Sequence, residues 1–311
     1  MNFTYRAEQR DNRHLDILEN AGLRVIVSRT GAELISLARP DESGAWRGFL
    51  WRDDNLSAPA AGWANHATVM GYYLHRLKDQ RTSYRGSEIR GGTHGFLRTK
   101  IWRLVDCDPT AGALTYQITP ADFTPSEYPL RVSLALTYAI RGENVEVDFR
   151  FTNHEPELAA HVSFGLHPGF AATSFDSFQF RMPAGTYRRY FSPDNFLSGE
   201  TQEIRFVGGE MPFEREKLPG SYILEFVDVP DRHFTFVDPP SGRVVELNLR
   251  DVPYLTLWSD GGNFLCVEPC WGLTDHHQQR PFEEKAGIQR IAPGGLLRAG
   301  FSMTPRQERN R

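Results

Sequence analysis

The fold is decided by residues 132–151, which read VSLALTYAIRGENVEVDFRF. In residues 132–140 large apolar side chains alternate with small or polar ones, and the alternation resumes at Val145 after the turn at residues 141–144. A period of two places successive side chains on opposite faces of a strand. Two such runs joined by a four-residue loop that contains glycine predict an antiparallel hairpin with one apolar face.

The same pattern recurs along the chain. Paired runs of strand length flank turns rich in Gly, Pro, Asn and Asp at residues 19–22, 238–242 and 259–263, which predicts three further hairpins. Helical periodicity is weak, and only residues 192–196 and 281–286 favour short helical turns. Strands at short spacing are typical of a large sandwich or barrel, so we expect an all-β, antiparallel β-sandwich.

The composition limits the class of protein. The net charge of −4 over 311 residues provides no basic face for nucleic acid, and no window approaches the roughly 18 apolar residues that span a membrane. Cys107, Cys266 and Cys270 are too few for a disulfide framework, so we expect buried free thiols in a reducing compartment. With no internal repeat or linker-like segment, we expect one soluble, cytoplasmic domain over residues 1–311.

Motifs for cofactors are absent from the sequence. No glycine cluster between a strand and a helix suggests a phosphate loop or a dinucleotide site, and no Gly-x-Ser-x-Gly elbow occurs. His276 and His277 follow Asp275, but adjacent residues of a strand point to opposite faces, and we interpret them as a solvated loop. We therefore expect neither a cofactor nor a metal.

Three segments place an ionisable side chain beside glycine or proline. His94 lies between glycines, which let the backbone approach a ligand closely, and His167 precedes Pro168 at an expected strand end. Glu268 is expected to close the apolar run of residues 264–268. A carboxylate at such a position requires partners or a raised pKa, and a raised pKa suits a general base.

These segments, in the same order, resemble motifs of the aldose 1-epimerase (galactose mutarotase-like) family. Residues 94–98 with Trp102 are similar to the family's His-Gly-Phe-Ala-Arg…Trp motif. Asn153 with residues 167–170 is similar to Asn…His-Pro-Tyr-Phe, and residues 266–272 resemble the closing Glu-Pro-Trp-x-Gly segment. Other similar segments are residues 31–37, 50–51, 71–79, 284–287 and 293–294, so the resemblance covers about residues 30–300.

The resemblance implies a single large antiparallel sandwich, the galactose mutarotase-like supersandwich, with a concave cleft that binds a small-molecule sugar. It implies that Glu268 is the general base, that His167 is the general acid, and that His94 positions the substrate. It also implies that Arg76 binds sugar hydroxyls.

Aromatic side chains complete the predicted site. Sugar faces stack on aromatic rings, and we predict that Trp258 and Phe170, with Trp271 as a further candidate, contact the substrate; a position in the buried core is the alternative for each. The chain departs from the family's pattern where Gly169 replaces the usual Tyr and where Cys270 intervenes before Trp271.

The implied reaction is the interconversion of sugar anomers. Opening a hemiacetal ring removes a proton from the C1 hydroxyl and adds one to the ring oxygen, so one carboxylate and one imidazolium suffice. No cofactor or covalent intermediate is required.

Other functions remain open at this point. A retaining glycosidase would need a second carboxylate about 5 Å from the first, and Asp260 and Asp275 are the candidates. A hexose-6-phosphate mutarotase would need further cations, for which Arg81, Arg85 and Arg98 are available. A non-catalytic sugar-binding or sensing protein on the same fold is a third possibility. The identity of the sugar and the oligomeric state are left open.

Overall fold

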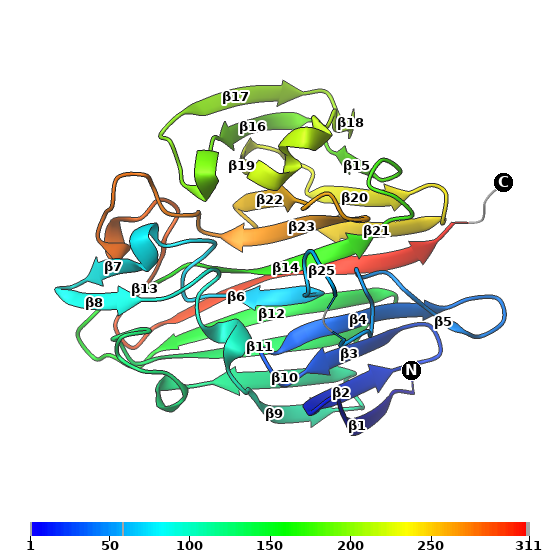
Figure 1. Cartoon of the computed structure of the whole chain (residues 1–311). Coiled ribbons are helices and arrows are strands. Elements are labelled where there is room, and N and C mark those ends of the chain that lie inside the picture. The colour runs from blue at the N-terminus through cyan, green and yellow to red at the C-terminus, as the bar shows by residue number, and fades with distance from the viewer. Residues whose placement is uncertain (1, 58, 309–311) are drawn as a thin grey trace.

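The protein is built from antiparallel sheets, one of which carries the candidate site (Figure 1). The computed structural model describes residues 2–57 and 59–308. The sheet that carries the site has seven strands. In spatial order they are β17 (Thr201–Phe206), β16 (Gly185–Tyr190), β19 (Tyr222–Asp228), β22 (Tyr254–Trp258), β23 (Phe264–Trp271), β14 (Phe164–Ala171) and β6 (Ala67–Met70).

A second, nine-stranded sheet runs the length of the molecule. The strand nearest the C-terminus lies in its middle, between strands from the two halves of the chain (Figure 1). In spatial order the strands are β18 (Gly209–Glu210), β15 (Gln179–Met182), β20 (His233–Asp238), β21 (Arg243–Asn248), β25 (Leu296–Gln307), β12 (Asn144–Asn153), β11 (Val132–Arg141), β10 (Ala113–Ile118) and β9 (Arg103–Asp108).

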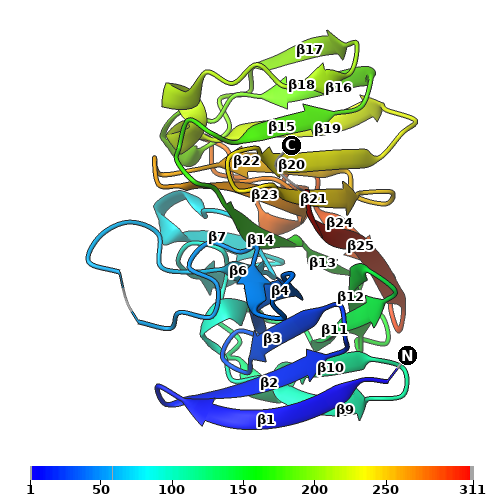
Figure 2. The same ribbon diagram turned by 90° about the vertical axis from the view of Figure 1, so that its right-hand side faces the viewer.

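Smaller sheets complete the architecture. Residues 4–48 supply a five-stranded sheet at the end of the molecule opposite β17 (Figures 1 and 2), consisting of β1 (Thr4–Arg10), β2 (Arg13–Glu19), β3 (Arg24–Ser28), β4 (Glu33–Pro40) and β5 (Trp46–Gly48). Two-stranded ribbons pair β7 (Arg81–Tyr84) with β8 (Ser87–Arg90) and β13 (Ala160–Val162) with β24 (Gln289–Ile291).

Helical structure in the described residues is limited to six 3-10 turns, none of them of a length and apolarity that would cross a membrane. The turns are Lys78–Gln80, Leu97–Thr99, Pro120–Asp122, Pro193–Asn195, Arg215–Gly220 and Phe282–Glu284.

The predicted fold class and hairpins are confirmed. Residues 132–151 form β11 and β12, which pair from Val132↔Asn153 to Arg141↔Asn144 around Gly142. The other three predicted hairpins are the pairs β2–β3, β20–β21 and β22–β23, and short 3-10 turns lie within both segments predicted to be helical.

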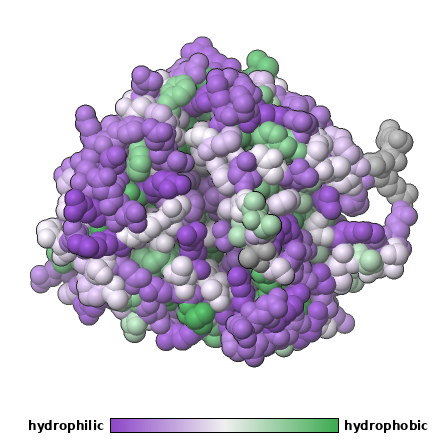
Figure 3. All heavy atoms as spheres, in the orientation of Figure 1, coloured by the Kyte–Doolittle hydropathy of each residue, from purple (hydrophilic) through white to green (hydrophobic). Residues whose placement is uncertain are grey.

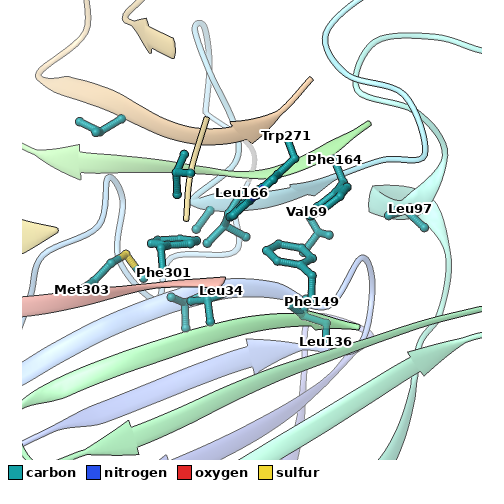
Figure 4. Close-up of a cluster of buried hydrophobic side chains, with 14 of the residues drawn as sticks. Leu34, Val69, Leu97, Leu136, Phe149, Phe164, Leu166, Trp271, Phe301 and Met303 are labelled. Carbon is teal, nitrogen blue, oxygen red and sulfur yellow. The ribbon is translucent and has the colours of Figure 1, made fainter. Parts of the chain in front are cut away.

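The main core lies between the two large sheets (Figure 4). Phe149 from β12 packs against Phe164 of β14 and Trp271 of β23, and the last two rings stack at 5.1 Å between centroids. Burial of one such side chain stabilises the fold by about 1.5–3 kcal/mol, so this layer holds the sheets together. Outside, hydrophobic residues are scattered singly on the mostly hydrophilic face in Figure 3.

The parity of β14 and β23 divides their side chains between the core and the candidate site. Phe164 and Leu166 of β14 lie in the core, whereas His167 lies on the other face of the strand. On β23, Val267 and Trp271 enter the core and Glu268 faces away from it. Alternation with a period of two is therefore what directs the ionisable groups to one side of the sheet.

The structure corrects the predicted position of His167 and Glu268 at strand ends. β14 continues four residues beyond His167, and β23 continues three residues beyond Glu268. Each residue precedes a proline, which lacks a donor N–H and therefore interrupts the ladder. The strands do not end there because pairing resumes on the far side of the interruption.

Candidate active site

A cavity of about 260 Å³ opens over the seven-stranded sheet. Its lining is predominantly polar or aromatic and draws on segments far apart in the sequence. The lining residues are Trp63, Asn65, His75, Arg76, Thr93, His94, Arg98, His167, Ser192, Asn195, Ser221, Ile223, Trp258, Glu268 and Thr274.

Strand register brings His167 and Glu268 together. β14 and β23 pair at Gly165↔Cys270 and again at Gly169↔Cys266, in the same register, so His167 lies opposite Glu268 in the unpaired interval. His167 Nε2 is 3.3 Å from Glu268 Oε1. Directly opposed residues on one face of a sheet are close neighbours, so the geometry follows from the backbone pairing.

Both groups are almost fully buried. Glu268 is 1% exposed and His167 is 4% exposed. Glu268 Oε2 and His167 Nδ1 have no hydrogen-bond partner among the described residues. Buried polar atoms are usually satisfied, so unpaired atoms that face a cavity mark a place where a polar ligand can bind.

Two further histidines approach Glu268 from loops. His94 N donates a hydrogen bond to the backbone oxygen of His75 (2.6 Å), which ties the two loops together. Both residues have positive φ, 51° for His75 and 63° for His94, a backbone region that is costly for residues other than glycine. His94 is followed by Gly95, where a side chain would lie 2.1 Å from the oxygen of Gly71. The loops therefore hold both imidazoles at the cavity at some conformational cost.

Two tryptophans form an aromatic wall. The Trp63 ring stacks on His167 at 4.9 Å between centroids, and Trp258 meets His167 edge-on at 5.8 Å. Gly169 makes room for this arrangement, because a Cβ atom there would lie 2.5 Å from the Trp63 ring. The glycine that departs from the family's usual tyrosine thus permits a second tryptophan in the wall.

Burial shifts the pKa values of the ionisable groups toward their neutral forms. It raises the pKa of Glu268 well above its usual range. Burial, reinforced by the charge of His75, lowers the pKa of His167 to about 3, and burial with the charge of Arg76 lowers that of His75 to about 4. The pKa of His94 also lies well below its usual value, first because of burial. Burial therefore favours a neutral carboxyl group that faces neutral imidazoles.

The permanent charges at the cavity are positive. Arg76 and Arg98 line it, and Glu268 is the single carboxylate in the lining drawn from the described residues. Asp275, which is 3% exposed, holds the segment that carries Arg76: its Oδ2 accepts a hydrogen bond from Lys78 N (2.9 Å), and its Oδ1 lies 2.5 Å from Lys285 Nζ.

Comparison with known proteins identifies the family. A family model described as aldose 1-epimerase matches residues 15–304. This chain belongs to the aldose 1-epimerase family.

The relatives named below are distant from this chain in sequence. It is 22% identical over 303 residues to the plasmid-borne protein LacX of Lactococcus lactis subsp. lactis, covering 92% of this chain and 98% of LacX. Among solved structures, it resembles a galactose mutarotase related enzyme from Lactobacillus acidophilus (TM-score 0.83, 24% identity, 94% and 97% of the two chains). It also resembles a galactose mutarotase-like protein from Lactobacillus casei (TM-score 0.82, 22% identity, 94% and 100%). These likenesses show a shared fold.

Most of the site residues that the sequence predicted line one cavity in this family member. They are Glu268, His167, His94, Arg76 and Trp258.

Phe170 is placed elsewhere: it is fully buried and packs against Phe236 in the core. The reason is parity, since Phe170 lies three residues from His167 on the same strand and so faces the opposite side. Trp271 also belongs to the core.

The three arginines that were candidates for binding a phosphate also lie in different places. Arg98 lines the cavity, whereas Arg81 lies on the β7–β8 ribbon beside Glu88 and Arg85 donates a hydrogen bond to the backbone oxygen of Ala159. Only Arg98 among the three can contact a ligand at Glu268.

His75 and Trp63 also line the cavity, and neither was predicted from the sequence. His75 directly precedes Arg76 in a segment that the family resemblance singled out, so the signal was present but only the arginine was considered. Trp63 lies in a loop rich in Ala, Gly and Pro without strand periodicity, and nothing in that segment connects it to His167.

Proposed function

We propose that this protein is an aldose 1-epimerase that interconverts the α and β anomers of an aldose. One observation carries the proposal: the buried carboxyl of Glu268 faces the imidazole of His167 across 3.3 Å at the wall of a polar cavity. A base and an acid at this spacing can reach the C1 hydroxyl and the ring oxygen of one sugar, which are bonded to the same carbon. The cavity volume, at about 260 Å³, suits a small ligand such as a monosaccharide.

The reaction needs one proton to be shared by the pair. Transfer of that proton from Glu268 to His167 gives a carboxylate and an imidazolium, and a sugar hydroxyl that donates to the carboxylate stabilises this form. Glu268 then removes the C1 hydroxyl proton while His167 protonates the ring oxygen, and the ring opens. After rotation about the C1–C2 bond the same groups act in reverse and close the ring. His94 and Arg76 hold the hydroxyls, and the Trp258 ring supports a face of the sugar.

Hydrolysis by a retaining mechanism is less well supported. It requires a second carboxylate about 5 Å from the first. Asp260 accepts a hydrogen bond from Trp63 N (2.8 Å) and Asp275 is paired with Lys285, and neither aspartate lines the cavity.

A phosphorylated aldose is a second candidate substrate. The guanidinium groups of Arg76 and Arg98 line the cavity, and neither has a hydrogen bond or ion pair to a protein group among the described residues. Unpaired guanidinium groups suit a phosphate, which they bind in a bidentate manner.

Anomer exchange measured by NMR tests both candidates. We would compare wild type, Glu268→Gln and a control, Glu246→Gln, on a panel of aldoses and aldose phosphates. Glu246 lies on β21 and is ion-paired with Arg306, outside the cavity. The proposal expects wild type and the control to accelerate exchange of at least one sugar, and Glu268→Gln to be slower by about 10²–10⁴-fold. A sugar that binds without faster exchange would instead make the protein a non-catalytic binder.

A further inference from the structure

Three side chains of different chemistry meet beside the cavity: the imidazole of His75, the carboxyl of Glu268 and the thiol of Cys270. One ligand atom from each lies within 4.8 Å of the other two. Cys270 Sγ is 3.9 Å from His75 Nε2, and His75 Nδ1 is 4.0 Å from Glu268 Oε2. The mechanism proposed above uses only the carboxyl of these three groups.

The arrangement is set by strand parity and by one loop. Glu268 and Cys270 are two residues apart on β23, so their side chains leave the same face of the sheet. His75 reaches this face from the loop that follows β6. Cys266 occupies the equivalent position on the other side of Glu268, but it is not part of the group.

One atom of the group lacks a partner. Glu268 Oε2 is the oxygen nearest His75, it has no hydrogen bond among the described residues, and the glutamate is 1% exposed. Cys270 is also fully buried, and its sulfur is 3.9 Å from Thr256 Oγ1. A buried carboxyl oxygen without a hydrogen-bond partner is costly, and a bound cation would satisfy it.

We propose that His75, Glu268 and Cys270 form a binding site for a zinc-like divalent cation. Imidazole nitrogen, thiolate sulfur and a carboxylate oxygen are ligands that zinc accepts, whereas magnesium and calcium prefer oxygen alone. Zinc bonds of about 2.0–2.3 Å place tetrahedral ligands roughly 3.3–3.8 Å apart, so no two of these atoms, which lie within 4.8 Å of one another, must approach by more than about 1.5 Å. Three protein ligands leave a fourth coordination position, which faces the cavity that His75 and Glu268 line.

Binding has a chemical consequence for the site. Cys270 ligates as a thiolate and Glu268 as a carboxylate, so the thiol proton and the carboxyl proton are both released to solvent when the metal bonds form. Glu268, once ligated, no longer accepts the proton of a C1 hydroxyl. On the proposed function, on which this consequence rests, zinc is therefore a reversible inhibitor of anomer exchange.

Cobalt(II) titration of the purified full-length protein tests the site independently of activity. Cobalt(II) is a spectroscopic substitute for zinc, and a thiolate ligand gives it a charge-transfer absorption in the near ultraviolet. We expect wild type to show this absorption and to lose it when zinc is added. Cys270→Ser removes the sulfur ligand and is expected to abolish the band, and His75→Gln is expected to weaken binding by at least about tenfold.

Cys266→Ser is the matched control, because Cys266 lies on the same strand, on the same face and at the same distance in sequence from Glu268. It is expected to keep the wild-type cobalt spectrum. The proposal is overturned if wild type shows no thiolate band, if the band survives in Cys270→Ser, or if Cys266→Ser loses it. A cobalt spectrum that follows these expectations in a protein without anomer exchange would sink the proposed function and leave the metal site standing. Exchange that zinc does not slow, at a concentration that displaces cobalt, would overturn the inhibitory role.

Discussion

The ionisable residues of the cavity are buried, and burial disfavours the charged form of each. Glu268 and the three histidines lie close together, and burial moves their pKa values in opposite directions, up for the carboxyl and down for the imidazoles. Burial therefore leaves the proton on the Glu268 carboxyl and not on the His167 imidazole. The carboxylate–imidazolium pair of the proposed reaction then depends on a sugar hydroxyl that stabilises the carboxylate.

The same burial makes stability depend on pH. The pKa of His75 is about 4 in the folded protein and 6.5 in an exposed histidine. Between pH 6.5 and about 4 the unfolded chain binds a proton at His75 that the folded protein does not bind. The free energy of unfolding is therefore unaffected by His75 above pH 6.5 and decreases as the pH falls toward 4. The slope for one such residue is at most about 1.4 kcal/mol per pH unit.

We therefore expect His75→Gln to show a shallower loss of unfolding free energy in mildly acidic solution than wild type. Urea unfolding of both proteins at about pH 7, 6 and 5 measures the difference. Parallel curves would mean that His75 is not held neutral in the folded state.

Three of the ionisable groups in the cavity could be predicted because each belongs to a recognisable motif, whereas His75 was not predicted although it lies within residues 71–79, which resemble the family. His94, His167 and Glu268 each lie beside glycine or proline within a family motif, and all three line the cavity. Phe170 was misassigned although the information was present, since counting three residues from His167 along a strand reverses the face. Trp63 could not have been found, because its contact with His167 depends on the path of a loop.

At the scale of elements, β14 shows how one strand serves both the core and the site. Its cavity face carries Gly165, His167 and Gly169, and small residues on each side of the histidine leave room for other groups. Above Gly169 that room is filled by the Trp63 ring, at 2.5 Å from where a Cβ atom would lie. Trp63 then stacks on His167.

Gly169→Ala is expected to displace Trp63 from His167. The wall of the cavity would then lose the Trp63 ring. Sugar binding should therefore weaken by about tenfold or more, with a smaller effect on the rate at which the bound sugar exchanges its anomers. Titration with sugar followed by tryptophan fluorescence measures the affinity. Gly220→Ala is the control, since nothing lies within 4 Å of its Cβ position. An unchanged affinity in Gly169→Ala would mean that Trp63 plays no part in binding.

Asp275 and Lys285 form a buried ion pair that fixes a loop of the cavity. Their side chains are 1% and 7% exposed and pair at 2.5 Å, and Asp275 also accepts a hydrogen bond from Lys78 N, two residues beyond Arg76. The pair thus fixes the loop that carries the arginine against the segment after β23.

Lys285→Met is expected to lower the free energy of unfolding by about 3–5 kcal/mol, because it leaves a buried carboxylate without its cation. The double variant Asp275→Asn with Lys285→Met should recover part of this loss, since no unpaired charge remains. Urea unfolding of both single variants and the double variant gives the coupling energy. Additive losses would show that the two side chains do not stabilise each other.

Elements joined by short turns could be predicted, and their order in the sheets could not. The hairpin of β11 and β12 follows from periodicity and a glycine turn, both of them local features. The pairing of β14 with β6 joins residues almost one hundred positions apart, for example Leu166 and Val69. Nothing in a period of two specifies which distant strand is the neighbour, because any strand with one apolar face satisfies the same pattern.

At the scale of the whole molecule, β25 joins the two halves of the chain. It pairs on one side with β12 from the first half and on the other with β21 from the second half. Its side chains Phe301 and Met303 lie in the same core as Leu34 of β4 (Figure 4). The nine-stranded sheet is therefore complete only when the end of the chain has been inserted.

This topology predicts that residues 1–311 unfold as one domain. If β25 leaves the sheet, β12 and β21 both lose a neighbour and the shared core is exposed, so neither half retains a closed hydrophobic core. Chemical denaturation should then give one transition whichever probe is used. Trp102, which is buried in the first half of the chain, and Trp271, which is buried in β23, provide local fluorescence probes when each is studied in a variant that lacks the other five tryptophans. Their midpoints should coincide with each other and with the loss of β-sheet circular dichroism. Two separated midpoints would divide the chain into independent domains and remove the central role assigned to β25.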